Sequence, residues 1–279
     1  MKKAGISIAA AAFILSGCQH LSAGSILDKQ TETQPVKQPD QEAVKKEKQP
    51  ALQKKPQTES RVPSEAAKKP LYSVSPVNWT LKPLSSSIPK KTALITIDDA
   101  PDKHALEMAK TLKTLGVNAI FFVNGHFLEN KEGIDALKEI HKMGFQIGNH
   151  TYHHKELKGL SEEEQKKEIL DLNTKIKEII GEKPKFFRAP FGINTDFSRK
   201  LAAQEKMTLM NWTFGYDWNK EYENKEALVD IMKNTPYLTD GSIILMHDRK
   251  WTSSALKEIV GNLRKAGYQL ADPNNIQSS

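Results

Sequence analysis

The stretch Thr96-Ile97-Asp98-Asp99-Ala100 decides how the rest of the chain is interpreted, because an apolar run that begins at Ala93 ends there in two adjacent carboxylates. A short apolar run of this kind is typical of a buried strand, and α/β enzymes place their chemistry at the carboxyl ends of such strands. Neighbouring residues of a strand point to opposite sides. We therefore expect the two carboxylates to have different tasks, one as a base and the other as a metal ligand.

Beyond Lys90, short apolar runs alternate with amphipathic helical patterns, which is typical of βα units and a mainly parallel sheet. Strands are expected at residues 93–97, 119–123, 146–148, 186–188, 208–212 and 242–246, with a closing strand near 268–271. Helices are expected at residues 104–115, 133–143, 161–180, 196–204, 225–234 and 253–266. A doubly wound sheet and a βα barrel both fit this alternation. Because residues 90–279 are few for a complete barrel of about 250 residues, we prefer an α/β fold that forms a truncated or irregular barrel.

The first residues have the pattern of an export signal. Met1-Lys2-Lys3 is basic, and residues 4–15 are apolar but too few to span a bilayer. Leu15-Ser16-Gly17-Cys18 resembles the lipobox of bacterial lipoproteins, in which the cysteine is lipidated and becomes the new N-terminus, and Cys18 is the only cysteine of the chain. The alternatives are an ordinary signal peptide with a chance cysteine or an uncleaved anchor helix. We predict a lipoprotein signal peptide at 1–17 and an exported protein anchored through Cys18 to the outer face of the cell membrane.

Three further segments follow the signal. Residues 18–70 consist largely of Gln, Lys, Glu, Pro, Ser and Thr, and such a segment buries too little apolar surface to offset the entropy of ordering. We expect a disordered tether there, stiffened by its prolines. Residues 71–89 carry scattered apolar side chains and are expected to form an ordered lead-in. Residues 90–279 are expected to form one catalytic domain.

The net charge of +7 does not indicate a nucleic-acid enzyme, because most of it lies outside the predicted domain. Residues 1–89 contain 13 Lys and Arg against 7 Asp and Glu, whereas residues 90–279 contain 28 against 27. A nearly neutral domain argues against nucleic acid as a partner. A basic segment close to an anchor suits an anionic membrane or wall surface.

The predicted strand that ends at Gly148 is followed by a second polar cluster, Asn149-His150-Thr151-Tyr152-His153-His154. Within one helical turn, His150 and His154 would point the same way, as two ligands of one divalent metal must. Two histidines and one carboxylate make a common open metal site, and Asp99 is the candidate for the third ligand. The alternative is a solvated polar loop, since this spacing of two histidines also occurs by chance.

Three more clusters follow predicted strands, namely Arg188-Ala189-Pro190-Phe191-Gly192, Asp217-Trp218 and Leu245-Met246-His247. Each has an ordinary structural interpretation when taken alone. Arg188 is then paired with a surface acid, Asp217 is a loop residue beside a packed tryptophan, and His247 is a satisfied core histidine. Five clusters at the same end of successive strands favour a single functional site.

Together these segments resemble the five motifs of the polysaccharide deacetylase family, also called the NodB-homology or carbohydrate esterase family 4 domain. The matching segments are Thr96 to Ala100, His150 to His154, Arg188 to Phe191, Asp217-Trp218 and Leu245 to His247, and Phe121 to Gly125 is similar to a further strand of the family. The resemblance covers residues 90 to 271. It implies a distorted, incomplete βα barrel and the metal-dependent removal of N-acetyl groups from a polysaccharide.

Carried over to this sequence, the resemblance assigns a role to each cluster. It makes Asp98 the general base and His247 the acid that protonates the departing amine, with Arg188 orienting the base and Asp217 the acid. It makes Asp99, His150 and His154 the ligands of a divalent metal, for which we expect Zn²⁺. It implies that Phe191, Trp218 and Leu245 line the groove and the acetyl pocket. The expected partners are an N-acetylated polysaccharide and, through Cys18, a membrane; we expect a monomer.

The sequence departs from the family pattern at two positions. Ala100 replaces a glycine, and if that position requires a positive φ, alanine is strained and shifts Asp99. Phe191 replaces a tyrosine and loses only a hydroxyl group. Two alternatives to the deacetylase remain open: a catalytically weak lipoprotein that binds a glycan with the same fold, and an esterase that removes O-acetyl groups at the same site.

Overall fold

The computed structural model describes residues 69–278, so Cys18, the expected signal peptide and nearly all of the expected tether lie outside the described residues. In the described part, a seven-stranded sheet has the order β7-β6-β5-β4-β3-β8, and β9 also pairs with β3. Its neighbouring strands are all parallel. The strands are β3 (Thr92–Ala100), β4 (Ala119–Val123), β5 (Gln146–Asn149), β6 (Phe186–Phe187), β7 (Thr208–Leu209), β8 (Ser242–His247) and β9 (Gln269–Leu270).

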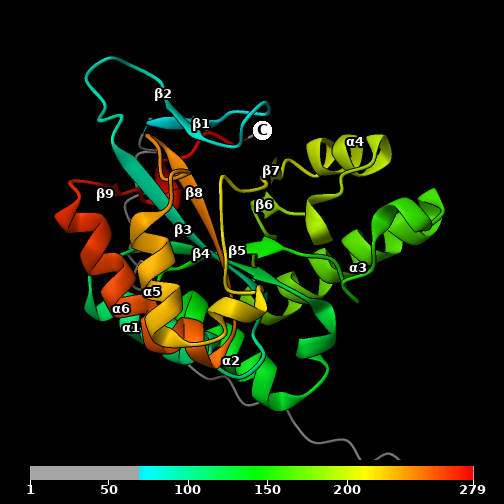
Figure 1. The fold of residues 1–279 in the computed structure, drawn as a ribbon. Helices are drawn as coiled ribbons and strands as arrows, with labels where there is room; N and C mark the ends of the chain where they lie inside the picture. Colours follow the sequence, from blue (N-terminus) through cyan, green and yellow to red (C-terminus); the bar gives the residue numbers. More distant parts are fainter. Residues whose placement is uncertain (1–68, 279) are drawn as a thin grey trace, which may run out of the picture. The chain divides into compact units, whose positions relative to one another are not determined.

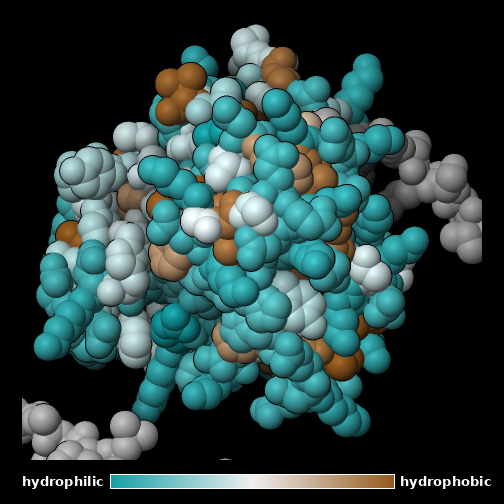
Figure 2. All heavy atoms as spheres, turned by 90° about the vertical axis from the view of Figure 1, so that its right-hand side faces the viewer, coloured by the Kyte–Doolittle hydropathy of each residue, from teal (hydrophilic) through white to brown (hydrophobic). Residues whose placement is uncertain are grey.

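Six α-helices of the described chain cover the outer face of this sheet (Figure 1). They are α1 (Ala105–Thr114), α2 (Lys131–Lys142), α3 (Glu162–Ile180), α4 (Asp196–Gln204), α5 (Lys225–Asn234) and α6 (Lys250–Lys265). Figure 2, which views the side of α3 and α4, shows a mostly hydrophilic surface with small, separate apolar groups. None of the described helices combines the length and apolar character that crossing a bilayer requires.

The helix ends follow local sequence signals. The side chain of Ser161 accepts a hydrogen bond from the backbone of Glu164, and the Glu164 carboxylate accepts one from the backbone of Ser161, so a capping box begins α3. The helix ends at Gly181, whose φ of 85° is left-handed, a conformation that glycine adopts at little cost. These two signals account for the bounds predicted for this helix.

The alternating side chains of β3 contribute to two separate hydrophobic cores, one on each face of the sheet. Ala93, Ile95 and Ile97 pack against the helices, whereas Leu94 faces the inside of the curled sheet. The inward row continues with Thr96 and then Asp98, because side chains alternate along a strand. The interior is therefore apolar near the amino ends of the strands and polar at their carboxyl ends.

The sheet curls far enough for its two edges to meet without completing a barrel. After β7 the chain crosses to β8, where Thr213 N–H donates to Ile243 O at 2.8 Å and Leu245 N–H donates to Phe214 O at 2.9 Å. This crossing ends β7 at Leu209, so the strand predicted to continue to Trp212 is too long. The distorted, incomplete βα barrel that the sequence predicts is confirmed.

A hairpin covers the amino ends of the strands. It consists of β1 (Tyr72–Val74) and β2 (Leu81–Pro83), and its Leu81 N–H donates to Gly241 O at 2.7 Å. A side chain at Gly241 would meet the Leu81 carbonyl at 2.2 Å, and its φ of +79° also requires glycine. The hairpin therefore closes the barrel opposite the carboxyl ends.

The bounds of β4, α4 and α5 agree with the prediction at both ends, whereas other boundaries differ by a few residues. Helix α6 begins at Lys250, whereas the sequence predicted Ser253, because Arg249 rather than a serine takes the capping position.

Candidate active site

A pocket of about 440 Å³ lies at the carboxyl ends of the strands. It is lined by Asp98, Asp99, His150, His154, Phe191, Trp212, Trp218, Leu245, His247 and Arg249. Most of the residues that the sequence singled out therefore surround one cavity. Arg188 and Asp217 do not line it but contact Asp98 and His247 from behind.

Arg188 supports the buried carboxylate of Asp98. Its Nη1 donates to Asp98 Oδ1 at 2.6 Å, and the two side chains are 0% and 2% exposed. The Nε and Nη2 groups donate to the carbonyls of Met210 and Asn211 at 3.1 and 3.0 Å. The guanidinium also lies 4.2 Å from the ring centre of Phe122. One arginine thus balances the charge of Asp98 and holds the chain where it crosses from β7 to β8.

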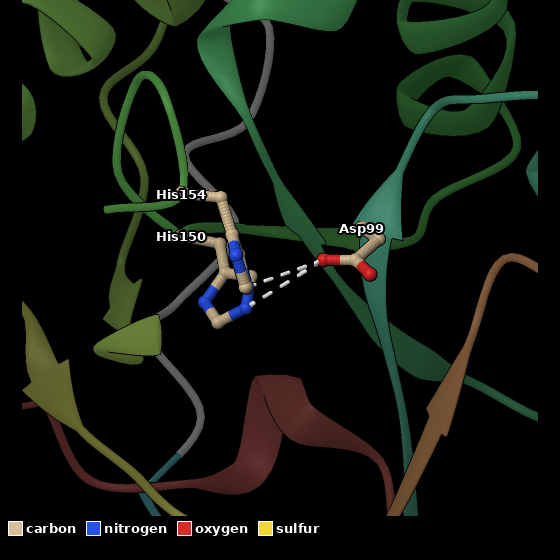
Figure 3. Close-up of side chains that lie close together, drawn as sticks. All are labelled: Asp99, His150 and His154. Carbon is tan, nitrogen blue, oxygen red and sulfur yellow. Dashed lines mark ion pairs between the residues drawn. The ribbon is translucent and has the colours of Figure 1, made fainter. Parts of the chain in front are cut away.

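The three predicted metal ligands face one another (Figure 3). Asp99 Oδ1 lies 3.5 Å from His154 Nε2 and 3.9 Å from His150 Nε2. His150 Nδ1 lies 2.7 Å from the carbonyl oxygen of Arg188. A carbonyl only accepts, so Nδ1 carries the hydrogen and Nε2 is the nitrogen left to ligate a metal. This Nε2 also lies 3.5 Å from Asp98 Oδ2.

This donor set fits a divalent metal. The three candidate ligand atoms all lie within 4.8 Å of one another. Two imidazole nitrogens and one carboxylate oxygen suit Zn²⁺ and leave further coordination positions open. Asp99, His150 and His154 are therefore the residues that would hold it.

The backbone of this site differs from the expectation in two ways. Residues 150–154 do not form a helical turn, and Thr151 and His154 have positive φ values of 65° and 55°. Asp99 is also left-handed, with φ 58°, at a register shift between β3 and β4. The alternation of the strand breaks there, and Asp98 and Asp99 line the same pocket. The positive φ thus belongs to Asp99, so the strain expected at Ala100 is absent.

Glu168 of α3 fixes the loop that carries the two histidines. Its carboxylate accepts from His153 N–H at 2.7 Å and lies 2.9 Å from His153 Nδ1. The backbone carbonyl of Glu168 accepts from Tyr152 N–H at 2.9 Å. This contact turns His153 away from the pocket and leaves His154 facing Asp99.

The electrostatics of the site favour neutral imidazole beside an ionised carboxylate. Burial lowers the pKa of His154, and the nearby His150 lowers it further. Burial acts to raise the pKa of Asp99, but the charges of His150, His247, His154 and Arg249 outweigh it, and the pKa is lowered. Both states are those that metal ligands require.

Asp217 and His247 form the second polar pair of the pocket. Asp217 Oδ1 lies 2.7 Å from His247 Nδ1, and Oδ2 accepts from His247 N–H at 2.6 Å and from Thr252 Oγ1 at 2.7 Å. Burial acts to lower the pKa of His247, but the hydrogen bond and charge of Asp217 outweigh it, and the pKa is raised. The imidazole therefore keeps its proton to higher pH than an ordinary histidine.

Apolar and aromatic side chains form the rest of the wall. The ring of Phe191 is 4.9 Å from that of His154, and Phe191 is 61% exposed. The ring of Trp218 is 5.5 Å from that of His247 and is also exposed, whereas Leu245 is buried. Two exposed aromatic rings beside a polar pocket suit contact with a sugar ring.

The sequence analysis missed three residues of this site. Asp248 is buried, and its carboxylate accepts from the backbone N–H groups of Asp102 and His104 at 2.7 and 2.6 Å. Arg249 donates from Nη2 to Asp99 Oδ2 at 2.9 Å, and Trp212 lines the pocket. Asp248 and Arg249 directly follow His247 at the end of β8. The strand-end argument that singled out His247 therefore also applied to them.

Comparisons with known proteins agree with this geometry. Residues 85–210 match the family described as Polysaccharide deacetylase. A peptidoglycan-N-acetylglucosamine deacetylase of Bacillus cereus is 30% identical over 195 residues, which are 67% of this chain and 88% of that protein. The peptidoglycan-N-acetylmuramic acid deacetylase PdaC of Bacillus subtilis is 32% identical over 67% of this chain and 39% of its own length.

The solved structures include a pseudoenzyme of carbohydrate esterase family 4 from Bacillus anthracis, with a TM-score of 0.60 and 28% identity. The match covers 66% of this chain and 64% of that one. The chain also spans 51% of the length of YlxY, another relative from Bacillus subtilis. Sequence motifs, fold and relatives agree, and the chain belongs to the polysaccharide deacetylase family.

Proposed function

We propose that the protein is a metal-dependent hydrolase that removes N-acetyl groups from a cell-wall polysaccharide of the GlcNAc or MurNAc type. The observation that carries this proposal is the pairing of a base and an acid in one pocket, with a candidate metal triad beside them. Asp98 is held by Arg188 at 2.6 Å, and His247 is held by Asp217 at 2.7 Å. The deacetylases among the relatives act on peptidoglycan, which supports this class of substrate.

The proposed mechanism divides proton transfer between the two pairs. Asp99, His150 and His154 would hold a divalent metal, for which we propose Zn²⁺, and the metal would supply Lewis-acid chemistry that polarises the acetamide carbonyl and lowers the pKa of a water molecule. Asp98 accepts the proton of the attacking water, and the guanidinium of Arg188 balances its buried negative charge at 2.6 Å. His247 donates a proton to the departing sugar amine, and its raised pKa keeps that proton bound to higher pH than in an ordinary histidine.

The remaining residues bind and orient the substrate. Phe191 and Trp218 offer exposed rings on which a sugar can stack, and Leu245 closes the pocket with an apolar surface that suits an acetyl methyl group. Thr252 fixes the second oxygen of Asp217, so the imidazole of His247 has one orientation. Chemistry at the sugar nitrogen requires this alignment of base, acid and acetyl pocket.

Acetate release tests the proposal. The purified protein with Zn²⁺ is incubated with peptidoglycan and with chitooligosaccharides, and free acetate and the deacetylated sugar are measured. We expect release from at least one glycan and loss of release in Asp98→Asn, which keeps the size and hydrogen bonds of the side chain. An acetylated ester substrate, run in parallel, separates amide from ester cleavage. No release from any acetylated glycan, with metal bound, would contradict the proposal.

A second candidate is a glycan-binding protein with weak or no catalysis. It is favoured by the likeness to the Bacillus anthracis pseudoenzyme. A binding protein does not require an acid and a base together, so the two pairs argue for the enzyme. Glycan binding of equal affinity in the unaltered protein and in Asp98→Asn, without acetate release in either, would favour the binding protein.

We further propose that the protein is exported, anchored by lipid on Cys18 to the outer face of the cell membrane, and active as a monomer. The support is the lipobox-like sequence that ends at Cys18. Incorporation of labelled palmitate in cells, lost in Cys18→Ala, tests the anchor. Recovery of unlabelled protein in the membrane fraction would contradict it.

A further inference from the structure

The two oxygens of the Asp99 carboxylate face different partners. Oδ1 lies 3.5 Å from His154 Nε2 and 3.9 Å from His150 Nε2, and both ion pairs in Figure 3 meet at this one oxygen. Oδ2 points away from the histidines and accepts from Arg249 Nη2 at 2.9 Å. Only one oxygen is therefore presented to the site where the metal would bind.

Arg249 reaches Asp99 from a fixed position. It is the residue just before α6, and its N–H donates to His247 O at 2.8 Å. Its Nη1 donates to Asp248 O at 3.2 Å. Asp248 N–H in turn donates to Asp98 O at 3.0 Å, which ties the ends of β3 and β8 together. The guanidinium thus has a defined place against Asp99, although its side chain is 37% exposed.

We propose that Arg249 is a positioning residue that holds Oδ2 of Asp99 and leaves Oδ1 alone to ligate the metal. The last torsion of an aspartate side chain is broad and roughly two-fold, so an unrestrained carboxylate can turn both oxygens toward a cation. A charge-assisted hydrogen bond from a guanidinium competes with that rotation. The inference rests on the proposed function, because it concerns the metal of the same site.

The expected benefit of this arrangement is an open metal site. A carboxylate that ligates with both oxygens occupies a position that water or substrate needs. The guanidinium also places a positive charge near a cation, which opposes metal binding. Arg249 therefore favours turnover at the expense of metal affinity. Replacing a residue with a purely structural role would instead weaken both turnover and metal binding.

The variant Arg249→Met tests the inference. It removes the donor and the charge but keeps much of the apolar length of the side chain. We expect kcat to fall by about tenfold or more, while KM stays nearly constant and Zn²⁺ binds at least as tightly as in the unaltered protein. In the Co²⁺-loaded protein, the visible absorption should weaken as the coordination number increases. Arg249→Lys, which keeps the charge and one donor, should recover part of kcat.

Lys250→Met is the matched control, since it removes an exposed cation at the same end of α6 and leaves Asp99 untouched. It should change neither the Co²⁺ spectrum nor kcat. An unchanged spectrum and kcat in Arg249→Met would overturn the inference, as would a weaker affinity for Zn²⁺. A higher KM at constant kcat would also overturn it, because Arg249 would then contact the glycan.

The outcome is separable from that of the proposed function. If the unaltered protein releases no acetate from any glycan, the proposed hydrolase is wrong. The Zn²⁺ affinity and the Co²⁺ spectrum still report whether Arg249 restrains Asp99.

Discussion

The two sides of the pocket are built in opposite ways. We call Asp99, His150 and His154 the metal side, and Asp98 and His247 with their partners Arg188 and Asp217 the proton-transfer side. On the metal side, Asp99 Oδ1 lies 3.5 Å or more from the histidine nitrogens, which is beyond good hydrogen-bond geometry. On the proton-transfer side, Asp98 meets Arg188 at 2.6 Å and His247 meets Asp217 at 2.7 Å. The proton-transfer side is complete within the protein itself, whereas the metal side brings together donors that do not bond one another.

The backbone shows the same difference. Asp99, Thr151 and His154 on the metal side have positive φ values, which cost free energy in residues other than glycine. Asp98 and His247 pair at matching positions of the parallel strands β3 and β8. The fold therefore supports a strained metal side next to an unstrained proton-transfer side.

Removal of metal should have the largest effect on activity. Chelation should reduce acetate release to background and lower Tm, and Zn²⁺ should restore both, because a ligand present at 100 times its Kd stabilises a protein by about 2.7 kcal/mol. Calorimetry and acetate assays on the same sample measure both effects. The variant His154→Ala should abolish the Zn²⁺-dependent increase in Tm. Full activity in chelator would show that the metal side does not take part.

Breaking the pair of Asp98 and Arg188 should have the largest effect on stability. Arg188→Met leaves a buried carboxylate without its cation, and removing one partner of a buried pair lowers the free energy of unfolding by about 3–5 kcal/mol. Urea denaturation measures this loss. The double variant with Asp98→Asn should recover part of it, since no charge then remains to be compensated. A loss no larger than that of an exposed ion pair, below about 1 kcal/mol, would mean that this side is not as tightly assembled as its distances indicate.

A smaller effect is expected from Asp217→Asn, which keeps the shape of the side chain but removes its charge. Asp217 raises the pKa of His247 above its ordinary value of 6.5. In the proposed mechanism the acid form of His247 is needed for turnover, so the variant should lose activity at lower pH than the unaltered protein. The alkaline limb of the pH profile of kcat/KM measures this shift. Because the pKa of His247 is higher in the folded than in the unfolded protein, its pairing with Asp217 stabilises the fold fully below pH 6.5. This stabilisation is lost as the pH rises through the pKa of His247 in the folded protein. An alkaline limb that does not move would rule out His247 as the acid.

The smallest effect is expected at the rim, which belongs to neither side. Phe191→Ala removes an exposed ring, and an aromatic contact is worth about 0.5–1.5 kcal/mol, so KM should rise by roughly two- to tenfold with kcat little changed. Steady-state kinetics on a glycan oligomer separate the two constants. Phe191→Tyr keeps the ring and should behave like the unaltered protein. A fall in kcat alone would place Phe191 in the chemistry rather than in binding.

The sequence predicted the backbone at Asp98 and His247 better than the backbone at Asp99 and His154, and the reason is physical. Asp98 and His247 continue regular strands, so the alternation of side chains and the strand-end argument both apply to them. Asp99 and His154 depend on left-handed backbone conformations, which local sequence does not reveal in residues other than glycine. The helical turn expected at residues 150–154 is wrong for this reason, although both imidazoles still face Asp99.

In the fold, too, the regular elements were predictable and the segment fixed by distant contacts was not. Apolar periodicity placed β4, α4 and α5 at their exact bounds, because each is a regular element with clear start and stop signals. It did not predict where β7 ends, since the crossing to β8 is fixed by Arg188, which lies far from that strand in the sequence. The apolar periodicity of a short segment carries no information about contacts with residues that lie far away in the sequence.

The hairpin of β1 and β2 has a practical consequence for handling the protein. Leu71 N–H donates to Asn275 O at 2.7 Å, and Gln277 N–H donates to Tyr72 O at 2.7 Å, so both ends of the described chain leave from the amino ends of the strands. The pocket opens at the other end of the barrel. A bead, a chip surface or an affinity tag joined at either end of the described residues would therefore leave the pocket free to meet an insoluble substrate such as a polysaccharide sheet.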